Sequence, residues 1–181
     1  MSEEAFFGCQ DISEKGFIRW SLDYTMGPII ECFLAIPQDQ RYRSVLGKLP
    51  APCRIVGHVA MNEESLIQGF AQGLRNRRCP FPRRLFDVFQ SPSEEEIREA
   101  IPDPGQLVAY WRAVREDTHR YLDCLTPEVL RHRPEESTLP EEDGNRGNPV
   151  REFFIMAIQH QNCHWGELRA ICKLIGAEMR W

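Results

Sequence analysis

Apolar residues recur every three to four positions in four long segments of this sequence, and this repeat constrains the fold more than any other feature. The spacing is that of one face of an α-helix. The segments that show it span residues 13–36, 53–74, 103–125 and 149–176. No segment shows the apolar–polar alternation of a β-strand. The sequence therefore predicts an all-α protein, most simply a four-helix bundle.

Two long connections separate the predicted helices. The connection between the second and third helices, residues 75–102, begins with a strongly basic run from Arg75 to Arg84. Within it, Ser93-Glu94-Glu95-Glu96 has the spacing of a capping box, which predicts a short helix. The connection between the third and fourth helices, residues 131–148, is expected to form an exposed acidic loop.

The first predicted helix contains the pair Gly27-Pro28. Proline lacks a backbone N–H donor, and its ring collides with the preceding turn of a helix. We therefore expect this helix to kink or break at Pro28.

The composition narrows the class of protein. With 181 residues, the chain has the length of one ordinary domain, and we expect a single helical bundle domain over residues 1–181. The formal net charge of −5 argues against nucleic acid as a partner. No apolar run is long enough for a membrane span, and the acidic start does not resemble a secretory signal. The seven cysteines are scattered without a CxxC pair, which argues against a disulfide framework. Together these features lead us to expect a cytoplasmic protein with no membrane partner.

The fourth predicted helix contains the clearest functional signal, which is two histidines four residues apart. His160 and His164 are offset by about 40° around the helix, so they stand one turn apart on its apolar side. Two imidazoles at this spacing can bind one metal ion through one nitrogen each. They can equally be core residues whose nitrogens are hydrogen-bonded. The pair alone leaves both interpretations open.

A metal ion needs a third ligand, and the other histidines are the candidates. His58 borders the apolar stripe of the second predicted helix, but the sequence does not show whether it lies level with the pair. His119 forms one ExxH motif with Glu116, whereas a di-iron bundle needs two such motifs and two further glutamates. His132 lies between two arginines, which is typical of an exposed residue. His58 is the strongest of the three candidates.

Two segments of the chain resemble the DinB/YfiT-like metal-binding four-helix bundles. Residues 56–63, Val-Gly-His-Val-Ala-Met-Asn-Glu, are similar to the family's second-helix pattern of a His, a small apolar pair and an acidic residue. Residues 160–168, His-Gln-Asn-Cys-His-Trp-Gly-Glu-Leu, are similar to its fourth-helix HxxxHxGQ pattern, with Glu167 where the family usually has Gln. The helix order and the loop lengths agree over most of the chain.

The resemblance implies a mononuclear site with one open position, whose ligands are His58, His160 and His164. Zinc, nickel, iron or manganese are all compatible with three imidazoles. The resemblance also implies a low-molecular-weight thiol as cofactor, because a divalent cation lowers the pKa of a bound thiol. The side chains expected to orient the imidazoles are Asn62, Glu63 and Glu167.

Three functional hypotheses follow. The first is a thiol-dependent S-transferase, or a related thiol-assisted enzyme, acting on small electrophiles; activation of water instead would give a metal-dependent hydrolase. The second is a non-catalytic metal-binding protein of the stress response. The third is a structural bundle with core histidines. The basic run Arg75–Arg84 is either a solvated loop or a binding segment for an anionic small-molecule substrate. Ile155, an apolar residue on the polar side of its helix, allows a homodimer through helix faces.

Overall fold

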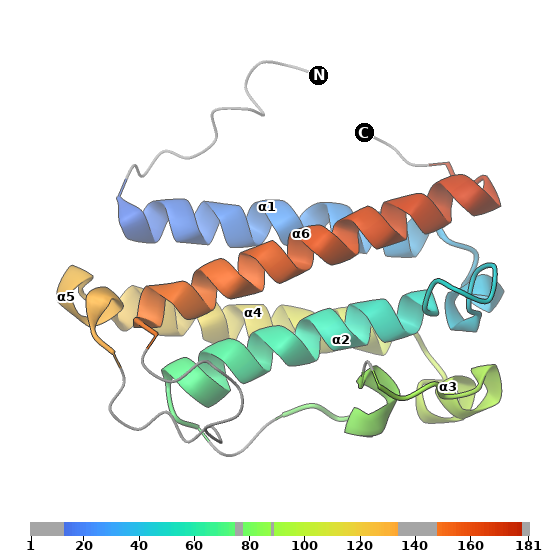
Figure 1. Cartoon of the computed structure of the whole chain (residues 1–181), viewed down its shortest axis with the longest axis horizontal. Helices are drawn as coiled ribbons and strands as arrows, with labels where there is room; N and C mark the ends of the chain where they lie inside the picture. The colour runs from blue at the N-terminus through green and yellow to red at the C-terminus, as the bar shows by residue number, and fades with distance from the viewer. Residues whose placement is uncertain (1–12, 75–77, 88, 134–147, 179–181) are drawn as a thin grey trace.

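Four long helices run side by side in the computed structural model of the chain, which describes residues 13–74, 78–87, 89–133 and 148–178 (Figure 1). They are α1 (Glu14–Ala35), α2 (Pro52–Glu64), α4 (Gly105–Cys124) and α6 (Val150–Ile175). Helix α1 packs mainly against α6, and α2 packs mainly against α4. Within the described ranges no β-strand forms, and Val45 and Leu49 make an isolated bridge. The predicted all-α bundle is confirmed.

Short helices occupy much of the connections. They are the 3-10 helices η2 (Gln38–Tyr42) and η4 (Arg83–Phe86) and the α-helices α3 (Glu94–Ala100) and α5 (Pro127–Arg131). The predicted capping box at the start of α3 is confirmed, because the backbone N–H of Glu96 donates to Ser93 Oγ and the N–H of Ser93 donates to Glu96 Oε2. The predicted acidic loop and the start of the basic run, residues 75–77, lie outside the described residues.

Helix α1 is uninterrupted at Pro28, so of the predicted kink or break, the break is wrong. Tyr24, whose carbonyl loses its helical donor at Pro28, is exposed, and Gly27 is also exposed. Water can therefore hydrate this carbonyl at the solvent side of the helix. On the opposite side, buried residues such as Met26 and Ile29 hold both halves of α1 in the core.

Helix α2 does not remain an α-helix over its predicted length. After Glu64 it continues as η3 (Ser65–Ala71), a π-helical segment in which the N–H of Gln72 donates to the carbonyl of Ile67, 3.0 Å away. A π-segment inserts an extra residue per turn, and such segments occur frequently near functional sites. The predicted helix over residues 53–74 is thus two helices of different geometry.

The apolar core consists of two clusters separated by a polar layer. Along α6, Phe153 and Ala157 belong to one cluster and Leu168 and Ile171 to the other. Buried Gln161 lies between these two groups in the sequence. The buried polar side chains Thr25, Glu63, Arg115 and Thr118 occupy the corresponding stretches of α1, α2 and α4.

None of the helices in the described part of the chain has the length and apolarity that crossing a membrane requires.

Candidate metal centre

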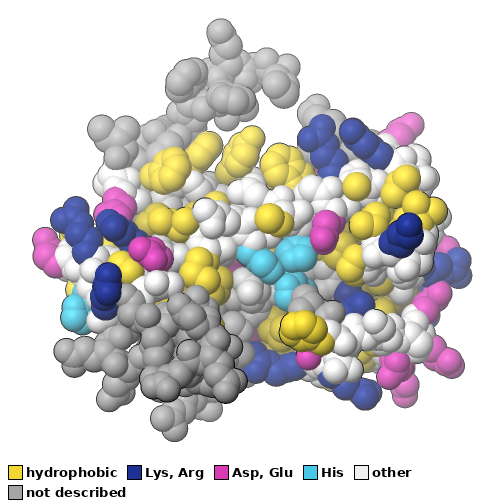
Figure 2. Space-filling view, viewed as in Figure 1, with side chains coloured by type: hydrophobic (Ala, Val, Ile, Leu, Met, Phe, Trp, Pro, Cys, Tyr) yellow, Lys and Arg dark blue, Asp and Glu magenta, His cyan; other side chains and the backbone are white. Residues whose placement is uncertain are grey.

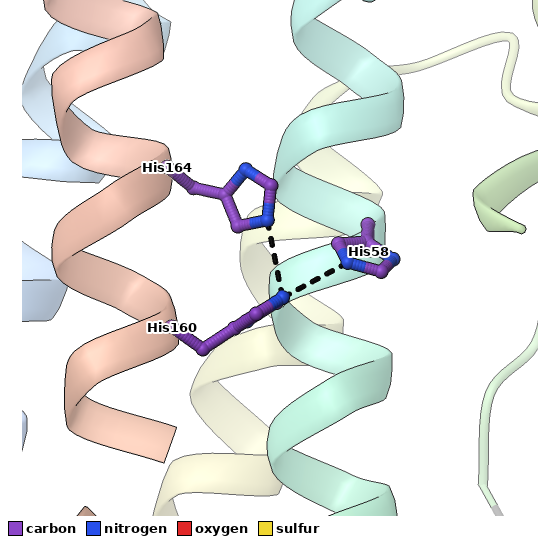
Figure 3. Close-up of side chains that lie close together, drawn as sticks. All are labelled: His58, His160 and His164. Carbon is purple, nitrogen blue, oxygen red and sulfur yellow. Dashed lines mark hydrogen bonds between the residues drawn. The ribbon is translucent and has the colours of Figure 1, made fainter. Parts of the chain in front are cut away.

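Three histidines meet between α2 and α6 (Figure 3). His58 comes from α2, and His160 and His164 come from successive turns of α6. The Nε2 atom of His160 lies 3.0 Å from Nε2 of His58 and 3.1 Å from Nε2 of His164. All three side chains are half-buried, and Figure 2 shows a group of histidine side chains, in cyan, exposed near the middle of this face of the molecule. The cluster is therefore accessible from solvent.

A glycine next to His58 allows the close packing that orients this histidine. A Cβ atom at Gly57 would overlap the ring of Phe86, which η4 places against α2. Because Gly57 has no side chain, the Phe86 ring packs directly on α2, and the Phe86 carbonyl oxygen lies 2.9 Å from Nδ1 of His58. The close approach therefore fixes the orientation of the imidazole.

Hydrogen bonds fix the tautomers of two of the histidines. The Phe86 carbonyl can only accept, so Nδ1 of a neutral His58 carries the proton. Nδ1 of His164 lies 2.7 Å from Oε2 of Glu167, an acceptor that likewise selects the Nδ1–H tautomer. The hydrogen bond from His164 also holds the pKa of the Glu167 carboxyl below its usual value. In both neutral rings, Nε2 is consequently unprotonated and directs its lone pair into the cluster.

His160 completes the cluster as a neutral ring. Burial, together with charge repulsion from the neighbouring His164 and His58, lowers its pKa to about 3. Burial and His164 also lower the pKa of His58. A neutral His160 has one N–H, so its Nε2 donates to at most one of the two lone pairs that face it. Within the described residues Nδ1 of His160 has no hydrogen-bond partner. Hydrogen bonding among the three rings is therefore incomplete.

The donor set fits a divalent cation. Three imidazole nitrogens are typical ligands for zinc and for several first-row transition metals. The observed Nε2–Nε2 distances of 3.0 and 3.1 Å are close to the spacing of about 3.3 Å expected for two nitrogens bound to one tetrahedral zinc ion. Oxygen-seeking Mg²⁺ and Ca²⁺ fit this set poorly. The residues that can hold a metal are His58, His160 and His164.

The three residues predicted to orient the imidazoles have different surroundings. Glu167 accepts a hydrogen bond from Nδ1 of His164. Asn62 is half-buried on α2, and its Oδ1 has no hydrogen-bond partner among the described residues. Glu63 is fully buried, and its hydrogen-bond partners are residues of α4 and α6 other than the three histidines.

Glu63 belongs instead to a buried ion-pair network at the bundle centre. Its carboxylate accepts hydrogen bonds from Arg115 at 2.8 and 2.9 Å and from Trp111 Nε1 at 2.8 Å. Thr118 Oγ1 and Gln161 Nε2 each donate to it at 2.9 Å. Burial alone would raise the pKa of Glu63, but Arg115 and these donors hold it below its usual value. The network links α2, α4 and α6.

The remaining histidines lie away from the cluster. Nε2 of His119 lies 3.2 Å from the carboxylate of Asp23 on α1. His132 follows α5 and is exposed. The ExxH pair of the third predicted helix therefore contributes nothing to the three-histidine cluster.

Sequence reasoning missed two contributors to the site. The Phe86 carbonyl is a backbone group, so no residue type marks it as a partner of His58. Gly57 lies within the segment that resembles the family's second helix, and its contact with Phe86 explains why a glycine fits at this position. A glycine directly before a candidate ligand was the one available signal of a close backbone approach.

The fold and the site together define a class: an all-helical bundle with a solvent-accessible cluster of three histidines from two helices. The family model described as the DinB superfamily matches residues 37–168, a range that includes all three histidines and Glu167. The chain belongs to the DinB superfamily, as the resemblance indicated. A search of curated proteins found no match.

Proposed function

We propose that this protein is a metal-dependent enzyme that binds one divalent cation at His58, His160 and His164. The observation that supports it best is the convergence of three Nε2 atoms, two of whose rings have their Nδ1–H groups engaged elsewhere. When all three rings are neutral, Nε2 of His160 can donate a hydrogen bond to only one of the two Nε2 lone pairs of His58 and His164. One cation, by contrast, can bind all three nitrogens.

The proposed reaction is thiol-dependent S-transfer to a small electrophile. A bound divalent cation supplies thiolate at neutral pH by lowering the pKa of a thiol. The chain's own residues contribute orientation: Phe86 and Glu167 fix two rings through their Nδ1–H groups. A pocket of about 580 Å³ adjoins the cluster and is lined by His58, His164 and Glu167 among others, which leaves room for a small molecule.

Metal content tests the first part of this proposal. Untagged protein that has never contacted a nickel column is analysed for zinc, nickel, iron and manganese, alongside His58→Ala, His160→Ala and His164→Ala. We expect about one metal ion per chain in the wild type and its loss in each variant. The matched control is the exposed His132→Ala, which should retain the metal. A metal-free wild type that also fails to load after reconstitution contradicts the proposal.

Turnover tests the second part. The metal-loaded protein is assayed with small thiols and an electrophile such as a chlorinated nitrobenzene, with and without the thiol. Thiol-dependent consumption that disappears in His160→Ala supports transfer. Hydrolysis of esters or amides without thiol favours the metal-dependent hydrolase, and stoichiometric metal with neither activity favours a non-catalytic metal-binding protein.

The proposal extends to location and assembly. A cytoplasmic location is supported by the six cysteines that the structure describes, because none of them forms a disulfide bond with another. Homodimerisation is supported by exposed apolar side chains on α1 and α6, with Phe17 59% and Ile155 42% exposed. Sedimentation equilibrium of the wild type and of Phe17→Ser tests the dimer.

A further inference from the structure

Two pockets meet at His58 and Phe86, on the solvent side of the histidine cluster. The first, called here the loop pocket, has a volume of about 580 Å³ and is lined on its two sides by residues of the loop 44–50 and by Phe86 with residues 90–92. The second, called the arginine pocket, has a volume of about 470 Å³ and is lined by Met61, Ser65, Arg83, Arg84 and Asp87 in addition to the shared residues. Both pockets are lined by His58, so each can bring a small molecule to the cluster.

The loop pocket has a cationic lining. Lys48 and Arg54 face a single carboxylate, Glu167, which already accepts a hydrogen bond from His164. Arg54 donates to the backbone carbonyls of Leu85, Asp87 and Gln90, and the charge of the Asp87 carboxylate attracts its guanidinium. Lys48 is exposed, so its positive charge remains available to a ligand.

A compact turn positions Lys48. The backbone groups of Val45 and Leu49 exchange two hydrogen bonds, at 3.1 and 3.0 Å, and Ser44 Oγ donates to the Leu49 carbonyl at 2.7 Å. Within the turn Leu46 has a φ of 53°, in the left-handed region that non-glycine residues rarely adopt. Strained turns of this kind persist where surrounding bonds hold them, and they occur often at binding sites.

The arginine pocket repeats this charge pattern. Arg83 and Arg84 belong to the 3-10 helix η4 that also holds Phe86, and they share the pocket with one carboxylate, Asp87. Arg84 has a distant ion-pair partner, with its Nη2 3.8 Å from Oε1 of Glu96, and its side chain is 73% exposed. Figure 2 shows Lys and Arg side chains, in dark blue, near the cyan histidines on this face. The chain as a whole has a formal net charge of −5, so this local excess of cations does not follow from the overall composition.

We propose that the small molecule bound at the histidine cluster is an anion whose carboxylate, or a group of similar charge, is recognised by Lys48 on one side and by Arg83 and Arg84 on the other. This inference rests on the proposed function, because the reactive end of the ligand would lie at the metal. The side chains of Lys48, Arg83 and Arg84 would select among thiols by their charge. The three histidines, through the metal, would be required for any thiol to bind. The two roles belong to different residues and can be separated by experiment.

Three monothiols that differ mainly in charge provide the test: 3-mercaptopropionate, 2-mercaptoethanol and cysteamine. Each is titrated into the cobalt(II)-loaded protein, and binding is followed by the thiolate-to-cobalt charge-transfer absorption. We expect the anionic thiol to bind about fivefold more tightly than the neutral one, and the cationic thiol to bind most weakly. Thiol acidity cannot produce this order, because the ammonium group of cysteamine favours its thiolate and the carboxylate of 3-mercaptopropionate opposes it.

Charge-removing variants assign the selectivity to the named residues. In Lys48→Gln/Arg83→Gln/Arg84→Gln the three thiols should bind with nearly equal affinity, while cobalt content stays at the wild-type level. Arg112→Gln, an exposed arginine of α4 that lines neither pocket, should keep the wild-type order. Higher salt should reduce the preference in the wild type only, because screening weakens exposed charge interactions.

The outcomes separate the two proposals. Full cobalt loading with equal affinity for the three thiols, or with an order unchanged in the triple variant, overturns the anion inference and leaves the metal site intact. A wild type that binds no cobalt overturns both proposals. A cobalt-loaded protein that gives no charge-transfer absorption with any thiol overturns the anion inference and the thiol part of the proposed function, and leaves the metal site intact.

Discussion

The buried Glu63–Arg115 network and the histidine cluster are neighbours in the bundle, yet they differ in how completely their polar groups are paired. Gln161 belongs to the network, and His160, the preceding residue of α6, belongs to the cluster. Each carboxylate oxygen of Glu63 accepts more than one hydrogen bond. His160, by contrast, has an unpartnered Nδ1 within the described residues and faces two lone pairs with a single proton.

This difference distinguishes buried polar groups that stabilise the fold from polar groups that are available to bind a ligand. A fully paired buried network holds the helices at one relative position and gains nothing from an added ligand. An incompletely paired cluster costs stability in the free protein, and a bound cation can recover that cost. The two regions should therefore respond in opposite ways when they are altered: changes to the network should affect folding, and changes to the cluster should affect metal binding.

The largest effect should come from Arg115→Leu. The substitution leaves the Glu63 carboxylate buried without its cationic partner, and breaking a buried ion pair in this way costs about 3–5 kcal/mol. Urea unfolding of the metal-free protein measures the loss. Arg112→Leu, at an exposed position of the same helix, is the control and should change the unfolding free energy by less than about 0.5 kcal/mol. Similar losses in the two variants would show that the network does not stabilise the bundle.

The next largest effect should be on metal affinity in Glu167→Ala. Without the carboxylate, Nδ1 of His164 loses the acceptor that fixes its tautomer, and removal of such a partner costs about 10–100-fold in affinity. Glu167→Gln keeps an uncharged acceptor and should lose less. Competition with a chelator measures the affinity, and Glu178→Ala, an exposed glutamate beyond α6, is the control. Unchanged affinity in Glu167→Ala would remove Glu167 from the site.

The parts of the site differ in how well the sequence could predict them. The spacing of His160 and His164 places them on adjacent turns of one helix, which follows from helix geometry alone. It was harder to predict which glutamate contacts a histidine, because Glu63 and Glu167 are both close in sequence to a candidate ligand. Glu63 is five residues after His58, and its principal partner, Arg115, is 52 residues further along the chain. That contact depends on the relative position of α2 and α4, which no local pattern encodes.

The detailed geometry of the helices was a second feature that the sequence did not predict. Helical periodicity predicts that residues 53–74 are helical, but it does not distinguish an α-helix from the π-helical turns after Glu64. Pro28 shows the reverse case, since its local preference to break a helix is overridden by tertiary packing of α1 on the core. The position of His58 beside the apolar stripe made it the strongest third-ligand candidate, and the family pattern implied it as a ligand, but only the three-dimensional structure shows the nitrogen atoms in contact.

A smaller effect should appear in the pH dependence of the metal-free protein. The pKa of His160 is lowered to about 3 in the folded state, from a usual value of 6.5, so the unfolded state takes up the proton first. Stability should therefore fall as the pH drops below about 6.5, by about 1–2 kcal/mol from pH 7 to pH 5 after screening of the half-exposed ring. Glu63, whose pKa is also lowered, contributes stability that is lost only below its usual value of 4.5.

Urea unfolding of metal-free protein across pH 7 to 5 measures this loss. His160→Gln should flatten the curve, and the exposed His132→Gln should leave it unchanged. Parallel curves for the wild type and His160→Gln would mean that the cluster does not hold His160 in its neutral form. Because the Glu63 network does not titrate in this window, the comparison isolates the histidine cluster.

The smallest effect should come from Thr25→Val, at the edge of the network. Oγ1 of Thr25 lies 2.5 Å from Oε1 of Gln161, but that oxygen also accepts from Nη2 of Arg115 at 3.0 Å. Loss of the hydroxyl leaves the acceptor paired, so the cost should be about 1 kcal/mol or less, with metal affinity unchanged and Thr25→Ser as the control. If Thr25→Val instead costs as much as Arg115→Leu, the network has no redundancy, and its contrast with the histidine cluster would lie in burial rather than in completeness of pairing.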